Sequence, residues 1–296
     1  MFNLIVTISI VSTLSEISCA QHTSMRACQI NDVQCFLDMI NKNNDDILEE
    51  LANVARSCSN SPGAVTQNVN YPDCDERSWP KDCFDLLEAG ERNSGVYTIY
   101  PLKNEPVDVY CDMISRGGGW TLFQRREDGS VNFNRCWDEY REGFGDLNGE
   151  HWLGNKHIHA MTRLRRNELL VQLEDWDEET RYQLYKQFYV LSEENHFQLY
   201  VNGTSGSAGD SLKTQNHQRF STRDRDIDND DNINVAAKFS SGFCFFFREH
   251  SSFWANLNGP YYMALEKRGK GIIWNQWRGG DNLKKSEMKL RQRPLD

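Results

Sequence analysis

Residues 109–155 read VYCDMISRGGGWTLFQRREDGSVNFNRCWDEYREGFGDLNGEHWLGN. Within them, residues 119–126 (GWTLFQRR) alternate apolar and polar side chains, the pattern of a half-buried β-strand. The glycines at 117–119 lack the lysine and the helix that follow the glycines of a phosphate-binding loop. They therefore predict a turn that leads into the strand.

The same strand-like alternation continues on both sides of this stretch. Residues 95–101 (GVYTIYP) and 106–113 (PVDVYCDM) alternate, and residues 167–176 (NELLVQLEDW) form a strong apolar run. Short helices are expected around residues 82–89 and 157–163. Many short strands with few helices, and without regular strand–helix–strand units, predict a mixed α+β domain over residues 79–296.

Several motifs occur in an order that resembles one family. DCFDLLEAGERNSGVYTIYP, the stretch at 109–155, FSTRDRDID, NLNGPYY and GIIWNQWRGGDNLKKSEMKLR follow one another as in the fibrinogen C-terminal domain. The chain resembles fibrinogen-related lectins such as ficolins, tachylectins and ixoderin-like proteins over about residues 79–294. The resemblance implies a fibrinogen C-terminal-like globular head that is not an enzyme, recognises acetylated sugars or protein ligands and often serves host defence.

Family members pair two cysteines early in the domain, and the resemblance implies that Cys83 and Cys111 form this disulfide. The two cysteines of the second family disulfide are replaced together, by Val235 and Ser252. Cys136 and Cys244 stand where the family usually has no cysteine. They form either a substitute bond or two buried free thiols, and the sequence leaves both readings open.

The N-terminal part predicts export and oligomerisation. Residues 1–20 (MFNLIVTISIVSTLSEISCA) have the apolar run and small-residue cleavage site of a secretory signal peptide, so the protein is expected to be secreted and extracellular. Within residues 21–58, the stretch 28–58 carries apolar residues at alternating steps of three and four. This heptad pattern favours a coiled-coil stalk that joins identical chains, against a single amphipathic helix packed on the main domain.

The cysteines of this stalk, Cys28, Cys35 and Cys58, could join parallel chains covalently. Residues 59–78 carry turn-forming residues without periodicity and are interpreted as a linker. Cleavage would remove Cys19, and the remaining eight of the nine cysteines are expected to be disulfides, because no C-x2-C pair suggests a zinc site.

The charge and motif content exclude several functional classes. The chain has 296 residues and a formal net charge of −10 without a block of basic residues, which argues against nucleic-acid binding. No stretch approaches the ~18 apolar residues of a membrane-spanning helix, so no membrane insertion is expected. Neither H-E-x-x-H nor G-x-S-x-G occurs, and no enzyme activity is predicted.

Residues 220–232 (FSTRDRDIDNDDN) hold five aspartates in a short span. Crowded carboxylates repel one another unless another group offsets their charge, so the segment is either a metal site or a solvated acidic loop. An EF-hand loop is excluded, because frames that start at Asp224 or Asp226 lack the required glycine and glutamate.

The fibrinogen-like calcium loop requires less than an EF-hand. The resemblance implies that Asp226 and Asp228 bind Ca²⁺ through their side chains and that Asp230 and Asn232 offer backbone carbonyls. Water would complete the shell of six to eight oxygen atoms that calcium prefers. Asp224 matches a family aspartate that need not touch the ion.

In sugar-binding relatives, the ligand pocket lies beside this loop and uses an aromatic run, a Cys-His pair before NLNG and later aromatic residues. Here the matching segment, residues 243–259, reads FCFFFREHSSFWANLNG. The Cys-His pair becomes Ser252 and Phe253, and His250 could replace the missing imidazole. The residues expected to contact the ligand are Phe247, His250, Ser252, Phe253, Trp254 and Asn256. A buried strand over Phe243–Phe247 is the alternative, at least for two of these phenylalanines.

Asn202 opens the sequence Asn-Gly-Thr, which predicts an N-glycosylation site on a polar loop of a secreted protein. The leading interpretation is a secreted, oligomeric, calcium-binding lectin-like recognition protein whose ligands are N-acetylated or other glycans on microbial surfaces. The rival is an extracellular protein-binding ligand of the same fold, which the altered pocket favours.

Overall fold

The computed structural model describes residues 79–102, 105–163, 166–228, 230, 232–245 and 255–292 of the chain. All of them belong to the compact unit that begins at Trp79. The predicted signal peptide, stalk and linker lie outside the described residues, as do all the expected ligand contacts except Asn256. Among the described residues, no helix is both long and apolar enough to cross a membrane.

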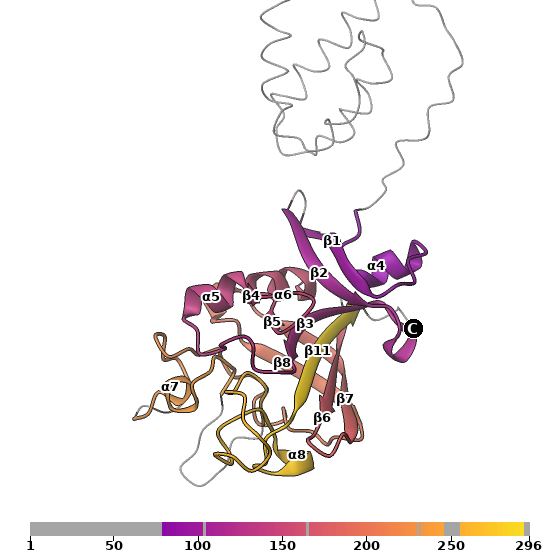
Figure 1. Ribbon diagram of the computed structural model, residues 1–296. Helices are drawn as coiled ribbons and strands as arrows, with labels where there is room; N and C mark the ends of the chain where they lie inside the picture. The colour runs from indigo at the N-terminus through magenta and orange to yellow at the C-terminus, as the bar shows by residue number, and fades with distance from the viewer. Residues whose placement is uncertain are drawn as a thin grey trace, which may run out of the picture. The chain divides into compact units, whose positions relative to one another are not determined.

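The described chain consists of strands with a few short helices between some of them (Figure 1). The strands are β1 (Gly95–Leu102), β2 (Glu105–Asp112), β3 (Trp120–Arg126), β4 (Phe144–Gly145), β5 (His151–Trp152), β6 (Asn167–Glu174), β7 (Thr180–Val190), β8 (Leu199–Gly206), β9 (Ala255–Asn256), β10 (Ile273–Trp274) and β11 (Lys285–Gln292). The helices are α4 (Cys83–Glu88), α5 (Trp137–Glu142), α6 (Asn155–Thr162), α7 (Val235–Phe239) and α8 (Asn275–Arg278), with 3₁₀ turns at Ser115–Gly117 and Glu193–Asn195.

The main sheet is antiparallel and has the strand order β1-β2-β3-β11-β6-β7-β8. Its middle strand, β11, comes last in the chain and lies between β3 and β6. Met288 on β11 faces Val171 on one side and Gln124 on the other. The sheet is therefore complete only when the C-terminal segment returns to its centre.

One part of the core lies where α6 packs on the sheet. Ile158 and Met161 of α6 are buried in it, and the helix contacts β1 and β7. Phe123 of β3 stacks on Phe188 of β7 with ring centroids 5.6 Å apart and meets Trp152 edge-on. Such pairs add to the free energy gained by burying their large apolar surfaces.

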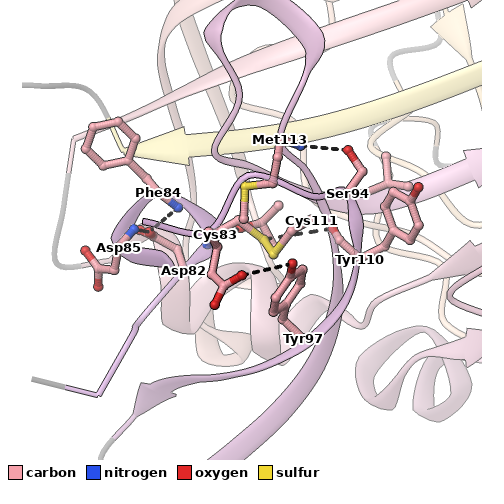
Figure 2. Close-up of a disulfide and its surroundings, with 12 residues drawn as sticks. Asp82, Cys83, Phe84, Asp85, Ser94, Tyr97, Tyr110, Cys111 and Met113 are labelled. Atoms are coloured by element: carbon pink, nitrogen blue, oxygen red, sulfur yellow. Dashed lines mark hydrogen bonds between the residues drawn. A yellow bond between two sulfur atoms is a disulfide. The ribbon is translucent and has the colours of Figure 1, made fainter. Parts of the chain in front are cut away.

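The predicted disulfide between Cys83 and Cys111 is confirmed, with a Cα–Cα distance of 5.5 Å. It joins the first residue of α4 to β2 (Figure 2). The side chain of Asp82 caps the same helix by accepting hydrogen bonds from the backbone N–H groups of Phe84 and Asp85. The start of the domain is thus held by a covalent bond and by a helix cap.

The structure confirms the strands that sequence alternation predicts and the two expected helices. Helices α5, α7 and α8, which have four to six residues each, were not predicted from the sequence. Helices of one to two turns are too short to show an apolar period, so capping and tertiary packing decide where they form. Mixed α+β architecture, the predicted fold class, describes the observed domain.

Cys136 and Cys244 are both free thiols in this structure, so the substitute disulfide is not formed. The Cys136 thiol donates to the Glu139 carboxylate 3.2 Å away at the start of α5. Cys244 is buried, and this burial raises the pKa of its thiol. The two cysteines therefore have different local roles, one at a helix end and one in the core.

Candidate functional site

The acidic segment begins with an aspartate that serves the fold. The Asp224 carboxylate accepts hydrogen bonds from the backbone N–H of Trp137 at 3.0 Å and from the Thr222 hydroxyl at 2.8 Å. It thereby joins this segment to the first residue of α5. Asp224 therefore has a structural role at the start of α5.

The next aspartates shape the loop through their own side chains. Asp228 accepts hydrogen bonds from the backbone N–H groups of Asp230 at 2.9 Å and Val235 at 3.0 Å. Asp230 accepts one from the backbone N–H of Asn232 at 2.9 Å. Because Val235 is the first residue of α7, Asp228 connects the loop to the helix that follows it.

Asp226 and Asp228 form a pair of neighbouring carboxylates. Burial raises the pKa of Asp228, and the nearby Asp226 raises it further, against the lowering effect of its two backbone donors. Within the described chain, neither carboxylate forms an ion pair with a basic side chain. Arg225 instead reaches Glu193 at 3.4 Å and lies over the Trp137 ring. The negative charge of the pair is therefore not offset by a neighbouring lysine or arginine.

These two carboxylates fit the reduced ligand set of a fibrinogen-like calcium loop. In the described ranges, no three acidic, histidine or cysteine side chains gather closely enough to hold a metal ion. A cation at Asp226 and Asp228 would therefore take its other oxygen ligands from the backbone and from water. Calcium, which accepts such mixed oxygen shells, suits this set better than zinc.

The acidic segment is joined directly to the start of the expected ligand segment. Ser221 and Phe243 exchange two backbone hydrogen bonds, of 2.9 and 3.1 Å, as an isolated bridge. Phe243 and Phe245 are buried and pack against each other. The alternative that two of these phenylalanines are core residues is therefore correct, but an isolated bridge replaces the regular strand in the part that the structure describes.

Asn256 is the expected ligand residue that the structure places. It is fully buried in β9, and its side-chain oxygen accepts a hydrogen bond from the Ser241 hydroxyl at 3.1 Å. Its side-chain nitrogen has no hydrogen-bond partner among the described residues. Phe247, His250, Ser252, Phe253 and Trp254 lie outside those residues, so their expected contacts stay predictions.

Two side chains of β3 hold the NLNG segment that follows, and the sequence analysis did not identify them. Gln124 donates to the Leu257 carbonyl at 2.8 Å, and Arg126 donates to the Gly259 carbonyl. The pairs are separated by 133 residues in the chain, so no local pattern could connect them. Polar residues inside an otherwise apolar strand were the signal that sequence reasoning could have used.

Another surface near the end of the domain combines exposed apolar and basic side chains. In residues 262–270, here called the Met263 loop, Met263 is 59% and Leu265 72% exposed, and Lys267 and Arg268 follow. Asn282 holds this loop by donating its backbone N–H to the Ala264 carbonyl and its side chain to the Met263 carbonyl. The apolar side chains thus stand on a backbone that the domain fixes in place.

Two clefts of about 350 Å³ occur in the described parts of the domain. One lies over β3, β6, β7 and β11, where Arg125 pairs with Glu287 at 2.8 Å, and the other includes His151 and His157. Neither contains a residue of the predicted calcium or ligand sites. The clefts therefore do not support the expected pocket, which depends on residues 246–254.

The antiparallel sheet with β11 at its centre, the α4–β2 disulfide and the acidic loop characterise one globular domain. Residues 79–293 match the family described as fibrinogen beta and gamma chains, C-terminal globular domain. The chain belongs to this family.

The relatives match most of this chain. Mouse Fibrinogen C domain-containing protein 1 is 48% identical over 217 residues, which are 71% of this chain and 46% of the relative. Human angiopoietin-2 is 37% identical over 258 residues, 86% of this chain and 50% of the relative. The fibrinogen-like globe domain of human ANGPTL6 has a TM-score of 0.68 at 35% identity and covers 78% of this chain and all of the solved one. The chain thus spans about half the length of these curated relatives.

Proposed function

We propose that this protein is an extracellular recognition protein that binds a ligand without transforming it. Its family membership and the signal-like residues 1–20 support this proposal. Its charge of −10 gives it no attraction for nucleic acid. The domain itself is the binding head, and residues 28–58 join several heads through a coiled-coil stalk.

The ligand that we propose first is a glycan with an acetylated amino sugar, as on a microbial surface. One observation carries this proposal: the bridge between Ser221 and Phe243 joins the acidic loop to the start of the aromatic segment 243–256. A methyl group of the ligand would pack on aromatic side chains, and polar groups at the rim would orient its amide. Residues 246–254, with His250 in place of the usual imidazole, would complete this pocket.

Calcium supports the pocket from the neighbouring loop in this proposal. Asp226 and Asp228 would supply carboxylates, and Asp230 and Asn232 would supply backbone carbonyls. The ion would offset the charge of a carboxylate pair that has no basic partner in the described chain. Asp228 also accepts a hydrogen bond from the first backbone N–H group of α7. A cation that orders this loop would therefore also stabilise the start of the helix.

Several heads on one stalk would strengthen weak binding at each single site. When one head binds, the linker keeps the others near the surface at a high effective concentration. Repeated sugars on a microbial surface suit such an oligomer. Isolated heads, cut within the linker 59–78, should bind the same ligands more weakly.

The test is binding of the purified oligomer to an array of glycans, first with calcium and then with a chelator. We expect binding to N-acetylated sugars that the chelator abolishes. His250→Ala should lower this binding, whereas Glu105→Gln, an exposed change on β2, should leave it unchanged. If a folded, calcium-stabilised protein bound none of the glycans, the carbohydrate proposal would be overturned.

A protein ligand is the second candidate, and the Met263 loop favours it. Exposed Met263 and Leu265 on a fixed backbone, beside basic residues, resemble the apolar anchors with a charged surround that protein interfaces use. Replacing both residues with serine should weaken binding to an extracellular protein partner and leave glycan binding intact. Unchanged binding to the protein partner together with weaker glycan binding would rule out this surface as the interface.

A further inference from the structure

Strand β8 forms one edge of the main sheet. On one side it pairs with β7, where Gln187 faces Asn202 and Tyr189 faces Tyr200. On its other side, the chain around residues 216–218 covers only the beginning of the strand, through backbone hydrogen bonds with Leu199. Residues 202–206 are exposed, so this half of β8 is open to solvent in the described structure.

Asn202 lies on this open half and begins the only Asn-x-Ser/Thr sequence in the chain. The structure therefore corrects the expectation of a polar loop, because Asn202 belongs to a strand. Its side-chain oxygen accepts a hydrogen bond from the Gly203 backbone N–H at 2.7 Å. Its nitrogen has one weak contact, 3.4 Å from the Gln187 side-chain oxygen. The oxygen is thus bound by the backbone, while the nitrogen of this exposed residue has only the long contact to Gln187.

Two aromatic side chains lie on the same face of the sheet as Asn202. Side chains two residues apart share one face of a strand, so Tyr200 is on the same face as Asn202. Tyr200 stacks on Tyr189 with ring centroids 4.4 Å apart and an interplanar angle of 12°. The His217 ring also meets the Tyr200 ring edge-on, with centroids 4.1 Å apart. Tyr189 and Tyr200 are only partly buried, although aromatic rings of this size usually bury most of their surface.

We propose that Asn202 carries an N-linked glycan whose first N-acetylglucosamine packs on the ring of Tyr200. The C–H groups of a sugar ring carry partial positive charge and pack well on the negative face of an aromatic ring. The amide oxygen keeps its bond to the Gly203 N–H after glycosylation, because only the nitrogen is modified. The proposal depends on export of the chain and is independent of the ligand that the head binds.

The covalent step requires a donor that the secretory pathway supplies, an oligosaccharide linked to a polyisoprenyl diphosphate. The Asn202 side-chain nitrogen bonds to C1 of the first sugar. The bond between C1 and the diphosphate oxygen breaks, and the diphosphate leaves with the electron pair. The amide loses one proton to a base on the transferring enzyme. Export through this pathway therefore provides both the donor and the catalyst.

The first test is mass spectrometry of the full chain secreted from a eukaryotic cell line that adds high-mannose glycans. We expect the peptide that contains Asn202 to carry a glycan, and Asn202→Gln to remove all N-glycan mass, because no second acceptor sequence exists. Thr204→Ser keeps the acceptor sequence and should keep the glycan. An unmodified Asn202 in the folded, secreted protein would overturn the proposal.

The second test isolates the contact with Tyr200. Endoglycosidase H leaves one N-acetylglucosamine, and this form should melt about 2–4 °C above the Asn202→Gln protein. When Tyr200→Leu is added to both proteins, this difference in melting temperature, here called the gap, should vanish. Tyr97→Leu on β1, at the opposite edge of the sheet, should lower both melting temperatures and keep the gap. A gap that survives Tyr200→Leu would show that the sugar does not pack on this ring.

Discussion

The domain holds the carboxylate of Glu150 and the carboxylate pair of Asp226 and Asp228 in opposite ways. Glu150 is buried, pairs with Arg126 at 3.2 Å and accepts four backbone hydrogen bonds from residues 127–131. Asp226 and Asp228 lie nearer the surface and face each other without a basic partner in the described chain. Arg126 and backbone N–H groups offset the charge of Glu150, whereas no basic side chain in the described chain offsets the charge of Asp226 and Asp228.

This difference separates a structural group from a candidate binding group. A buried carboxylate survives in a core only when paired and hydrogen-bonded, and Glu150 meets both conditions. A carboxylate pair near the surface can keep its charge because solvent or an added cation offsets it. Removing the charge of Glu150 should therefore destabilise the fold. Removing the charges of Asp226 and Asp228 should instead relieve their mutual repulsion.

The largest effect is expected at Glu150. Glu150→Gln would leave the Arg126 guanidinium buried without its counter-charge and should cost about 3–5 kcal/mol of unfolding free energy. Denaturant titration measures this loss. Glu105→Gln, an exposed change, should stay within about 0.5 kcal/mol of the parent. A loss at Glu150 no larger than that of the control would contradict its structural role.

Calcium should produce the next largest effect. At a hundred times its dissociation constant, a ligand of the folded state adds about 2.7 kcal/mol, which raises the melting temperature of a domain of this size by about 5–10 °C. Asp226→Asn with Asp228→Asn should abolish this shift in a thermal melt. An unchanged shift would place the ion elsewhere.

The same double variant sharpens the contrast when no calcium is added. Because it removes like-charge repulsion, its melting temperature in chelator should equal or exceed that of the parent in chelator. Glu150→Gln should be less stable than the parent with or without calcium. If the double variant were as destabilised as Glu150→Gln in chelator, the acidic loop would be a structural group as well.

A smaller, pH-dependent effect is expected at Asp112, which resembles Glu150. Burial raises its pKa, but Lys289, whose ammonium lies 2.6 Å away, outweighs burial and lowers the pKa from 3.8 to about 2. A carboxyl whose folded pKa is lowered stabilises the fold above its unfolded pKa and loses this contribution as pH falls through its folded pKa. The loss should be about 2 kcal/mol between about pH 4 and pH 2.

Acid titration of stability measures this contribution. Asp112→Asn should be less stable than the parent at neutral pH, and the difference should shrink as pH falls from 4 toward 2. Parallel acid transitions in the two proteins would show that the ion pair with Lys289 contributes nothing across this range.

Much of the local structure could be predicted from sequence. Alternation located β1, β2 and β3 closely, because a strand with one buried face has a period of two that no tertiary contact needs to reveal, and the apolar run over residues 167–176 located β6. The pairing of Cys83 with Cys111 followed from the family resemblance and is confirmed. The short helices α5 and α7 were not predicted. Each begins at a backbone N–H group that donates to an aspartate outside the helix, Asp224 for α5 and Asp228 for α7.

The candidate site was predicted less completely. The sequence indicated the carboxylates of the acidic loop, and the structure adds that Asp224 serves the fold while Asp226 and Asp228 remain without a basic partner in the described ranges. Asn202 was recognised as an acceptor, but its place on a strand beside Tyr200 depended on the pairing of β7 with β8. Sequence shows which groups are present, and only packing shows which are already engaged.

The sequence by itself determined the local elements, the early disulfide through its family resemblance, and the acidic segment, because these depend on residues close together in the chain or on an ordered set of motifs. The tertiary structure alone decided which charges are paired. Asp112 and Lys289 are 177 residues apart, and Gln124 lies 133 residues before the carbonyl that it contacts. Asp112 and Lys289 meet because β11, which carries Lys289, enters the sheet between β3 and β6, and a contact between such distant segments exists only after both are in place.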